Sequence, residues 1–156
     1  MKQEIDPEDT SRAQAFELWM KSPMPMVTLT KTFDVTRLFK VSRRRGLKFN
    51  MLFCWCISKA STQMEEFYLL PEQGKLYKYD RLAINVIVNN RAGGINSCDI
   101  PYSTDQFCNP MVMWGRYRKG WLKTTLPISF QFHHAQMDGG HAAHFLEELQ
   151  KVIKTT

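Results

Sequence analysis

The stretch that decides the fold reads LPISFQFHHAQMDGG from Leu126 to Gly140. In its first half, apolar residues alternate with polar ones, which is the period of a half-buried strand. Two adjacent histidines follow, and if the strand continues their side chains point to opposite sides. Asp138-Gly139-Gly140 predicts a turn, and the apolar residues after it recur at helical spacing. The histidines are therefore expected at a strand-to-helix junction, where side chains commonly reach a cleft.

Either histidine could serve as a general base, because imidazole can remove a proton from a hydroxyl at neutral pH. The alternative is a packing role, since a histidine at a strand end is commonly buried and hydrogen-bonded. The choice between the two depends on the residues around the pair.

The pattern His-His-x-x-x-Asp-Gly over residues 133–139 resembles the signature of the chloramphenicol acetyltransferases, which dihydrolipoamide-type acyltransferase domains and the condensation domains of peptide synthetases share. The sequence around this motif is similar to the chloramphenicol acetyltransferase family in particular. The matching segments are Asn109-Pro110, Trp114-Gly115-Arg116-Tyr117, Leu126-Pro127-Ile128 and residues 145–150. The resemblance implies an α+β fold, a two-layer sandwich in which helices cover a mixed sheet.

In that family the second histidine is the general base, and the aspartate of the motif pairs with an arginine near the N-terminus. The resemblance therefore assigns the base to His134 and the structural aspartate to Asp138. Arg12 looks like the matching arginine, and its planar fork could bond both carboxylate oxygens and so fix the turn. The alternative for Arg12 is an exposed charge on a helix.

The same resemblance implies substrate-binding positions. Trp19 and Ile95 fall where family residues contact the acceptor, and Tyr117 falls where an aromatic ring stacks on the adenine of coenzyme A. Met113 replaces a family residue whose hydroxyl helps to hold a water near the transition state. Ordinary packing is an open alternative for both Trp19 and Tyr117.

The activity implied is transfer of an acetyl group from acetyl-coenzyme A, the co-substrate, to a small hydroxyl acceptor such as chloramphenicol, which would give antibiotic resistance. The resemblance also implies a homotrimer with the active site at a subunit interface. From the residues themselves we expect no metal, nucleic acid or membrane partner. Two alternatives remain open. One is a trimeric scaffold or binding protein without catalysis, and the other is an acyltransferase for a different small hydroxyl acceptor.

The resemblance breaks between Phe107 and Cys108, where the family carries a long helix, further strands and a serine that bonds the tetrahedral intermediate. Either the segment is deleted, or the protein carries it and the 156-residue sequence leaves it out. Deletion would expose several apolar faces, which a domain stable by only about 5 to 15 kcal/mol should not survive. We therefore favour omission over deletion.

Composition fits one soluble domain over residues 1–156, with 44% hydrophobic residues and no apolar run of membrane-spanning length. Met1 to Thr10 is polar and lacks the apolar segment of a signal peptide, so cytoplasm is expected, with free thiols. The net charge of +6 would suit nucleic acid or the phosphates of coenzyme A, and charge alone does not decide. Arg43 to Arg45 is expected to end a helix capped by Gly46.

The remaining elements follow from periodicity and from turn residues. His141 and His144 lie three residues apart on the last helix, and we expect neither to bind a metal. The expected elements are a helix capped by Ser11, a strand at 26–33, a helix from Asp34 or Thr36 to Gly46, a buried helix from 51 capped by Asn50, a hairpin turning at Gln73-Gly74, a strand at 82–88, and a strand at 111–117 followed by a turn at 118–120.

Overall fold

The computed structural model describes residues 1–82, 85–89, 95–96 and 109–156. Its longest strand, β9 (Thr124–His133), is central to a four-stranded sheet. β2 (Met26–Asp34) pairs with β9 along one edge, and β7 (Met111–Trp114) and β8 (Arg118–Lys119) pair with it along the other. Every strand pairing among the described residues is antiparallel.

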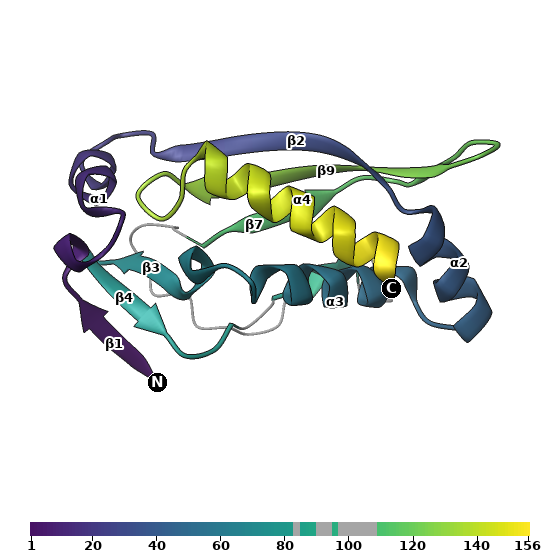
Figure 1. The fold of residues 1–156 in the computed structure, drawn as a ribbon, viewed down its shortest axis with the longest axis horizontal. Helices are drawn as coiled ribbons and strands as arrows, with labels where there is room; N and C mark the ends of the chain where they lie inside the picture. The colour runs from purple at the N-terminus through teal and green to yellow at the C-terminus, as the bar shows by residue number, and fades with distance from the viewer. Residues whose placement is uncertain (83–84, 90–94, 97–108) are drawn as a thin grey trace.

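Two helices cover one face of this sheet, as Figure 1 shows. They are α3 (Phe49–Ser61) and α4 (Gly139–Thr155), which also pack against each other. The strand β9 alternates strictly, with residues 126, 128, 130 and 132 buried towards the helices and the residues between them partly exposed. The expected α+β fold, with helices over a sheet, is therefore confirmed.

The core lies between the sheet and these helices and is built largely from aromatic rings. Phe130 packs between Phe67 and Phe145, with ring centroids 5.9 and 4.7 Å away, and all three are buried. Burying a large apolar side chain stabilises a fold by roughly 1.5 to 3 kcal/mol, so this cluster alone fixes the position of β9 against α4.

A second, smaller sheet lies beyond the end of β9 that carries the histidines (Figure 1). Its strands are ordered β1 (Lys2–Ile5), β4 (Lys75–Tyr79), β3 (Leu69–Glu72). Gln73 and Gly74 make the predicted hairpin turn, and both have positive φ, 51° and 78°, as a tight two-residue hairpin requires. The helix α1 (Ala13–Met20) and the short helix η1 (Pro7–Asp9) pack beside this sheet.

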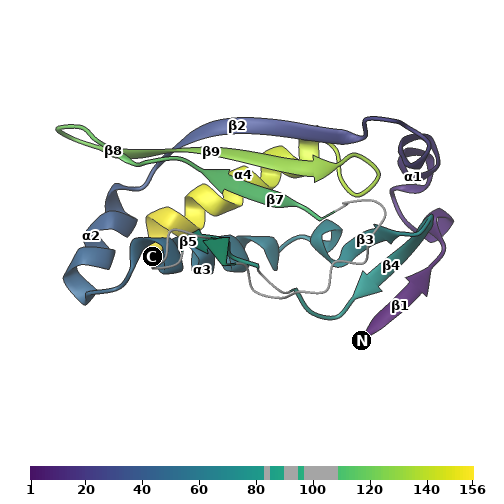
Figure 2. The same cartoon turned by 180° about the vertical axis from the view of Figure 1, so that it is seen from behind.

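The opposite end of the molecule carries α2 (Thr36–Arg45) and the hairpin between β8 and β9, which projects past α2 in Figure 2. Gly46 ends α2 with a φ of 65°, and its N–H bonds back to the carbonyls of Ser42 and Arg43. The predicted cap is confirmed, and the three arginines lie in the last turn of the helix, where they complement its dipole.

Several expected elements were wrong in detail. Residues 82 and 85–87 are not in a strand, and the strand there, β5 (Val88–Asn89), is only two residues long and pairs with β6 (Ile95–Asn96). The first two residues of the expected turn at 118–120 form the strand β8, and the chain turns after them, where the Gly120 N–H donates to the Lys123 carbonyl. A glycine near a hairpin locates the turn only to within a few residues.

The starts of two helices and the burial of one of them also differ from the expectations from the sequence. Ser11 does not cap α1, whose first residue follows Arg12, and α3 begins at Phe49, before the expected cap at Asn50. The expectation that α3 is wholly buried was wrong, because Met51 and Trp55 are 60% and 48% exposed. Apolar residues around the whole of a helix do not by themselves show that each side is covered.

The cysteines in the described part of the chain are free thiols, as expected. Cys54 and Cys56 are free and buried in α3, whereas Cys98 and Cys108 lie outside the described residues. None of the helices in the described part of the chain has the length and apolar character needed to cross a membrane.

Candidate functional site

The candidate site is the loop that joins β9 to α4. At its start the chain turns tightly, because the N–H groups of Gln136 and Met137 both donate to the His133 carbonyl, at 2.9 and 3.2 Å. The His133 side chain is 3% exposed, and its Nδ1 accepts the N–H of Ala135 at 3.1 Å. Burial lowers the pKa of His133, and the neighbouring charge of His134 lowers it further. His133 is therefore a packing residue of the loop.

His134 points to a different environment, as expected for adjacent residues at a strand end. Its ring is partly exposed and stacks on Trp19 of α1, with centroids 4.3 Å apart and planes 7° from parallel. Its N–H donates to the Pro25 carbonyl at 2.8 Å. Its Nδ1 is buried, and no hydrogen-bond partner for that atom lies among the described residues. The ring is thus oriented by stacking and by its own backbone.

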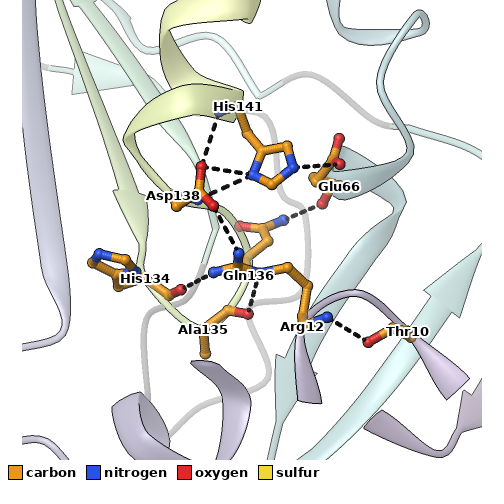
Figure 3. Close-up of polar contacts among 8 residues, drawn as sticks. All are labelled: Thr10, Arg12, Glu66, His134, Ala135, Gln136, Asp138 and His141. Carbon is orange, nitrogen blue, oxygen red and sulfur yellow. Dashed lines mark hydrogen bonds and ion pairs between the residues drawn. The ribbon is translucent and has the colours of Figure 1, made fainter. Parts of the chain in front are cut away.

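Arg12 reaches the loop from the residue before α1 and is only 5% exposed (Figure 3). Its Nη1 lies 3.0 Å from Oδ2 of Asp138, which is the ion pair expected between these residues. The expectation that the guanidinium bonds both carboxylate oxygens was wrong. Nη2 donates instead to the His134 carbonyl at 2.6 Å, and Nε contacts the Ala135 carbonyl at 3.5 Å.

This arrangement makes Arg12 a direct support of His134. The three contacts satisfy donors on three different nitrogens of a buried cation, which would be costly to bury with fewer partners. Because one of the acceptors is the His134 carbonyl, the guanidinium fixes the backbone that carries the imidazole. The alternative of an exposed helix charge is excluded by the burial of Arg12.

Asp138 joins the loop to the first turn of α4. Its Oδ1 accepts the His141 N–H at 3.0 Å, and the His141 side chain contacts the Asp138 N–H in return, so the two residues form a capping box. Burial pushes the pKa of Asp138 up, but the His141 N–H and the charges of His141 and Arg12 together hold the pKa below its usual range. Asp138 is therefore ionised at neutral pH.

Three residues around the motif were not anticipated. Gln136 is fully buried and donates from Nε2 to the Glu66 carbonyl at 2.9 Å. His141 lies between two carboxylates, with Nδ1 2.9 Å from Oδ1 of Asp138 and Nε2 3.1 Å from Oε1 of Glu66. The i, i+3 spacing of Asp138 and His141 is a capping signal that the sequence does contain, whereas nothing local marks Glu66.

Two of the other predicted site residues, Met113 and Tyr117, do not lie beside His134 in this chain. Met113 pairs with Ser129, four residues before His133, which is roughly 13 Å along the strand. Tyr117 packs on Phe39 at a centroid distance of 5.0 Å, near the hairpin end. Ile95 lies in β6, and its side chain is outside the described part of the structure. Phe107 and Cys108, between which the resemblance to the family breaks, are also outside it.

A cavity of about 730 Å³ lies near this end of the molecule but not at the histidines. It is open between η1, α1 and the hairpin of β3 and β4, and Phe16 and Met20 form its apolar floor. Acidic side chains of Asp6, Glu8 and Glu17 rim it. In the described residues no group of histidine, cysteine or acidic side chains could hold a metal ion.

The sequence that forms this loop is similar to that of known proteins. Residues 95–150 match the family model described as chloramphenicol acetyltransferase. Over 46 residues, 30% of this chain, the sequence is 44% identical to a chloramphenicol acetyltransferase from Vibrio anguillarum, and the match spans only 21% of that relative.

A longer match extends the similarity over nearly the whole chain. It covers 95% of this chain and 93% of a chloramphenicol acetyltransferase from Clostridium perfringens, with 23% identity. It runs over 203 positions, more than the 156 residues of this chain, so it contains gaps in this sequence. Such gaps are in keeping with the break noted at Phe107 and Cys108.

Solved structures share the fold at lower identity. A chloramphenicol acetyltransferase superposes with a TM-score of 0.81 at 15% identity, covering 98% of this chain and 100% of that one. A probable dihydrolipoamide acetyltransferase from Listeria monocytogenes follows at 0.64 and 9%, covering 97% and 93%. At these identities the similarity establishes the fold and not the chemistry.

Proposed function

The chain belongs to the chloramphenicol acetyltransferase family of acyltransferases, and from this premise we propose that it transfers an acetyl group from acetyl-coenzyme A to the hydroxyl of a small acceptor, with His134 as the general base. The observation that carries the proposal is the way His134 is held. Trp19 stacks on its ring and Arg12 bonds its carbonyl, while no carboxylate contacts the imidazole itself in the described residues.

Burial of Nδ1 supports Nε2 of His134 as the atom that meets the acceptor hydroxyl in this proposal. In the proposed reaction Nε2 takes the hydroxyl proton while the acceptor oxygen attacks the thioester carbonyl carbon. The carbon–sulfur bond then breaks, and the imidazolium returns the proton to the thiolate of coenzyme A, so no acyl-enzyme forms.

The remaining predicted roles belong to the same proposal. Trp19, Ile95 and Met113 would line the acceptor site, and Tyr117 would stack on adenine. Support for Tyr117 comes from its surroundings, because Arg43 and Lys119 lie over the ring of Phe39, which Tyr117 contacts. These cations could attract the phosphates of coenzyme A.

We also propose that the active form is a cytoplasmic homotrimer. The distance between Met113 and His133 along the sheet supports it, because residues of a neighbouring copy could supply the acceptor contacts that one chain does not bring together. The outer face of β2 offers such an interface, since Thr28, Thr30 and Thr32 are exposed and uncharged. Chloramphenicol is the acceptor to test first, and its acetylation would give resistance.

The test is release of coenzyme A thiol from acetyl-coenzyme A in the presence of chloramphenicol. General-base catalysis contributes about 100- to 10,000-fold, so His134→Ala should lower kcat by that amount. The control is His144→Ala, an exposed histidine on α4, which should leave kcat unchanged. Thermal unfolding of both variants checks that the fold is retained. Full turnover by His134→Ala would refute the proposed base.

A second candidate, a binding or scaffold protein without catalysis, is favoured by one observation. The 203-position alignment requires gaps in this 156-residue chain, and a lost oxyanion donor would cost roughly 3 to 4 kcal/mol of transition-state stabilisation. Intact mass separates the cases. A mass near 18.3 kDa means that the segment is deleted, and a mass several kilodaltons larger removes the support for this candidate.

A further inference from the structure

Glu66 and His141 lie outside the predicted catalytic set, but His141 contacts Asp138 of that set and Glu66 contacts His141 (Figure 3). Glu66 belongs to η2 (Glu65–Tyr68), which is distant from the loop in sequence. It contacts the loop region twice, through its carboxylate to Nε2 of His141 at 3.1 Å and through its carbonyl to the Gln136 side chain at 2.9 Å. The contacts come from both the backbone and the side chain of one residue, so η2 and the loop cannot shift independently.

The ring of His141 connects the carboxylates of Glu66 and Asp138. Oδ1 of Asp138 lies 2.9 Å from Nδ1, and Oε1 of Glu66 lies 3.1 Å from Nε2. A carboxylate only accepts hydrogen bonds, so each of these contacts is attractive when the facing nitrogen carries a proton. Nδ1 of His141 lies 2.9 Å from Oδ1 and 3.4 Å from the Asp138 backbone nitrogen, so it either donates to Oδ1 or accepts the Asp138 N–H, and both contacts hold the ring against Asp138.

The connection continues from Asp138 to the proposed base. Oδ1 of Asp138 faces His141, while Oδ2 accepts from Nη1 of Arg12 at 3.0 Å. Nη2 of the same guanidinium donates to the His134 carbonyl at 2.6 Å. Each group therefore uses different atoms for its two neighbours, and the contacts from η2 to His134 can all be made at once.

We propose that Glu66 and His141 are positioning residues for acyl transfer, which act on the His134 imidazole through Asp138 and Arg12. The inference rests on the proposed function, because it assigns a catalytic consequence to the position of His134. Neither residue needs to touch a substrate. Loss of either one removes side-chain support from Asp138, whose carboxylate keeps the His141 N–H and Arg12 as partners, so the direction of Arg12 is less firmly fixed. A misplacement near 1 Å can cost up to about 100-fold in rate.

The experiment compares Glu66→Ala and His141→Ala with two matched controls. Glu65→Ala alters the adjacent acid of η2, which is 64% exposed and pairs with Lys78, and His144→Ala alters an exposed histidine of α4. We expect kcat to fall about 10-fold in the first two variants, with KM for both substrates within about twofold, as for a group that acts only on the transition state. Both controls should match the parent protein.

The conservative variant Glu66→Gln separates positioning from general destabilisation. The Gln side-chain oxygen can still accept from Nε2 of His141, so Glu66→Gln should recover part of the lost kcat. The proposal is overturned if Glu66→Ala and His141→Ala turn over like the parent, if Glu65→Ala loses as much kcat as Glu66→Ala, or if KM rises while kcat is unchanged.

A second measurement does not depend on turnover. The rate at which diethyl pyrocarbonate modifies His134, followed by mass spectrometry, reports how firmly the ring is packed. We expect faster modification in Glu66→Ala than in the parent or in Glu65→Ala, and equal rates would overturn the proposal even if no acceptor were known. Full turnover by His134→Ala would refute the proposed base instead. An inactive His134→Ala beside a fully active Glu66→Ala would refute only the positioning role.

Discussion

The two ends of β9 belong to one continuous strand and differ sharply in how they are supported. At the Thr124 end the hairpin turn is closed by one backbone bond, from the Gly120 N–H to the Lys123 carbonyl, and Trp121 and Leu122 at its tip are 99% and 82% exposed. At the His133 end the loop is buried, and residues 135 to 137 have no exposed surface.

The difference lies in where the contacts come from. The tip of the hairpin is supported by residues near it in sequence, and its base at Thr124 bonds to Val35 and Thr36. The loop around His134 is bonded to Pro25, to Arg12 and to Glu66, which belong to three distant segments. A turn between strands needs only local pairing. A side chain that must keep one position during a reaction needs support from rigid neighbours, and the loop at the His133 end has that support.

The largest expected loss of stability comes from replacing the aspartate at the His133 end of β9, and the aspartate at the Thr124 end provides the reference. Asp138→Ala removes the cap of α4 and leaves the buried guanidinium of Arg12 without its counter-ion, so we expect the free energy of unfolding to fall by about 2 to 3 kcal/mol. Asp34→Ala removes a carboxylate that accepts from the Thr36 N–H near the hairpin, and should cost about 1 kcal/mol.

Urea unfolding of the two alanine variants measures both losses. Because each variant deletes the same chemical group from a helix start, the difference between them measures what Arg12 and the His141 ring together add at the His133 end. Equal losses would mean that the ion pair with Asp138 contributes nothing beyond an ordinary cap.

A smaller effect on stability is expected at the buried His133 end, where the free energy of unfolding should depend on pH through His133. Burial and the charge of His134 lower the pKa of His133, so the unfolded chain binds more protons than the folded one below the ordinary histidine pKa of 6.5. Stability is therefore full above pH 6.5 and falls as the pH drops below it, by at most about 1.4 kcal/mol per pH unit. Protonation of Nδ1 would also break the bond from the Ala135 N–H.

The matched variant is His133→Asn, whose side-chain oxygen can still accept the Ala135 N–H but does not titrate. Unfolding free energies measured from pH 7 to pH 5 should fall less steeply for His133→Asn than for the parent. Parallel pH profiles would show that His133 does not contribute to the acid sensitivity.

The smallest effect is expected at the hairpin tip. Trp121→Ser and Leu122→Ser remove side chains that are almost fully exposed, so each should change the free energy of unfolding by less than about 0.5 kcal/mol. Thermal unfolding at one protein concentration measures this. A loss above about 1 kcal/mol would show that the tip is covered in solution, for example by a neighbouring copy, and would weaken the contrast between the two ends.

The sequence predicted the elements that have a strong local signal. The alternation in residues 126–132, the glycine at 46 and the turn at Gln73-Gly74 were each sufficient to locate a strand, a helix end or a hairpin. The strand β1 was missed because it is polar and mostly exposed, so it has no apolar alternation to reveal it. It forms because β4 offers an edge with which it can pair.

For the candidate site, the sequence by itself determined the residue types, their order at the strand-to-helix junction and the pairing of Arg12 with Asp138, since that pairing follows from a recognisable motif. Only the tertiary structure decided that Arg12 bonds the His134 carbonyl, that Trp19 stacks on the imidazole and that Glu66 reaches His141. The physical reason is the distance along the chain over which each kind of signal acts. Periodicity and turn chemistry act over a few residues, whereas these bonds join groups whose distance is set by the packing of the whole core.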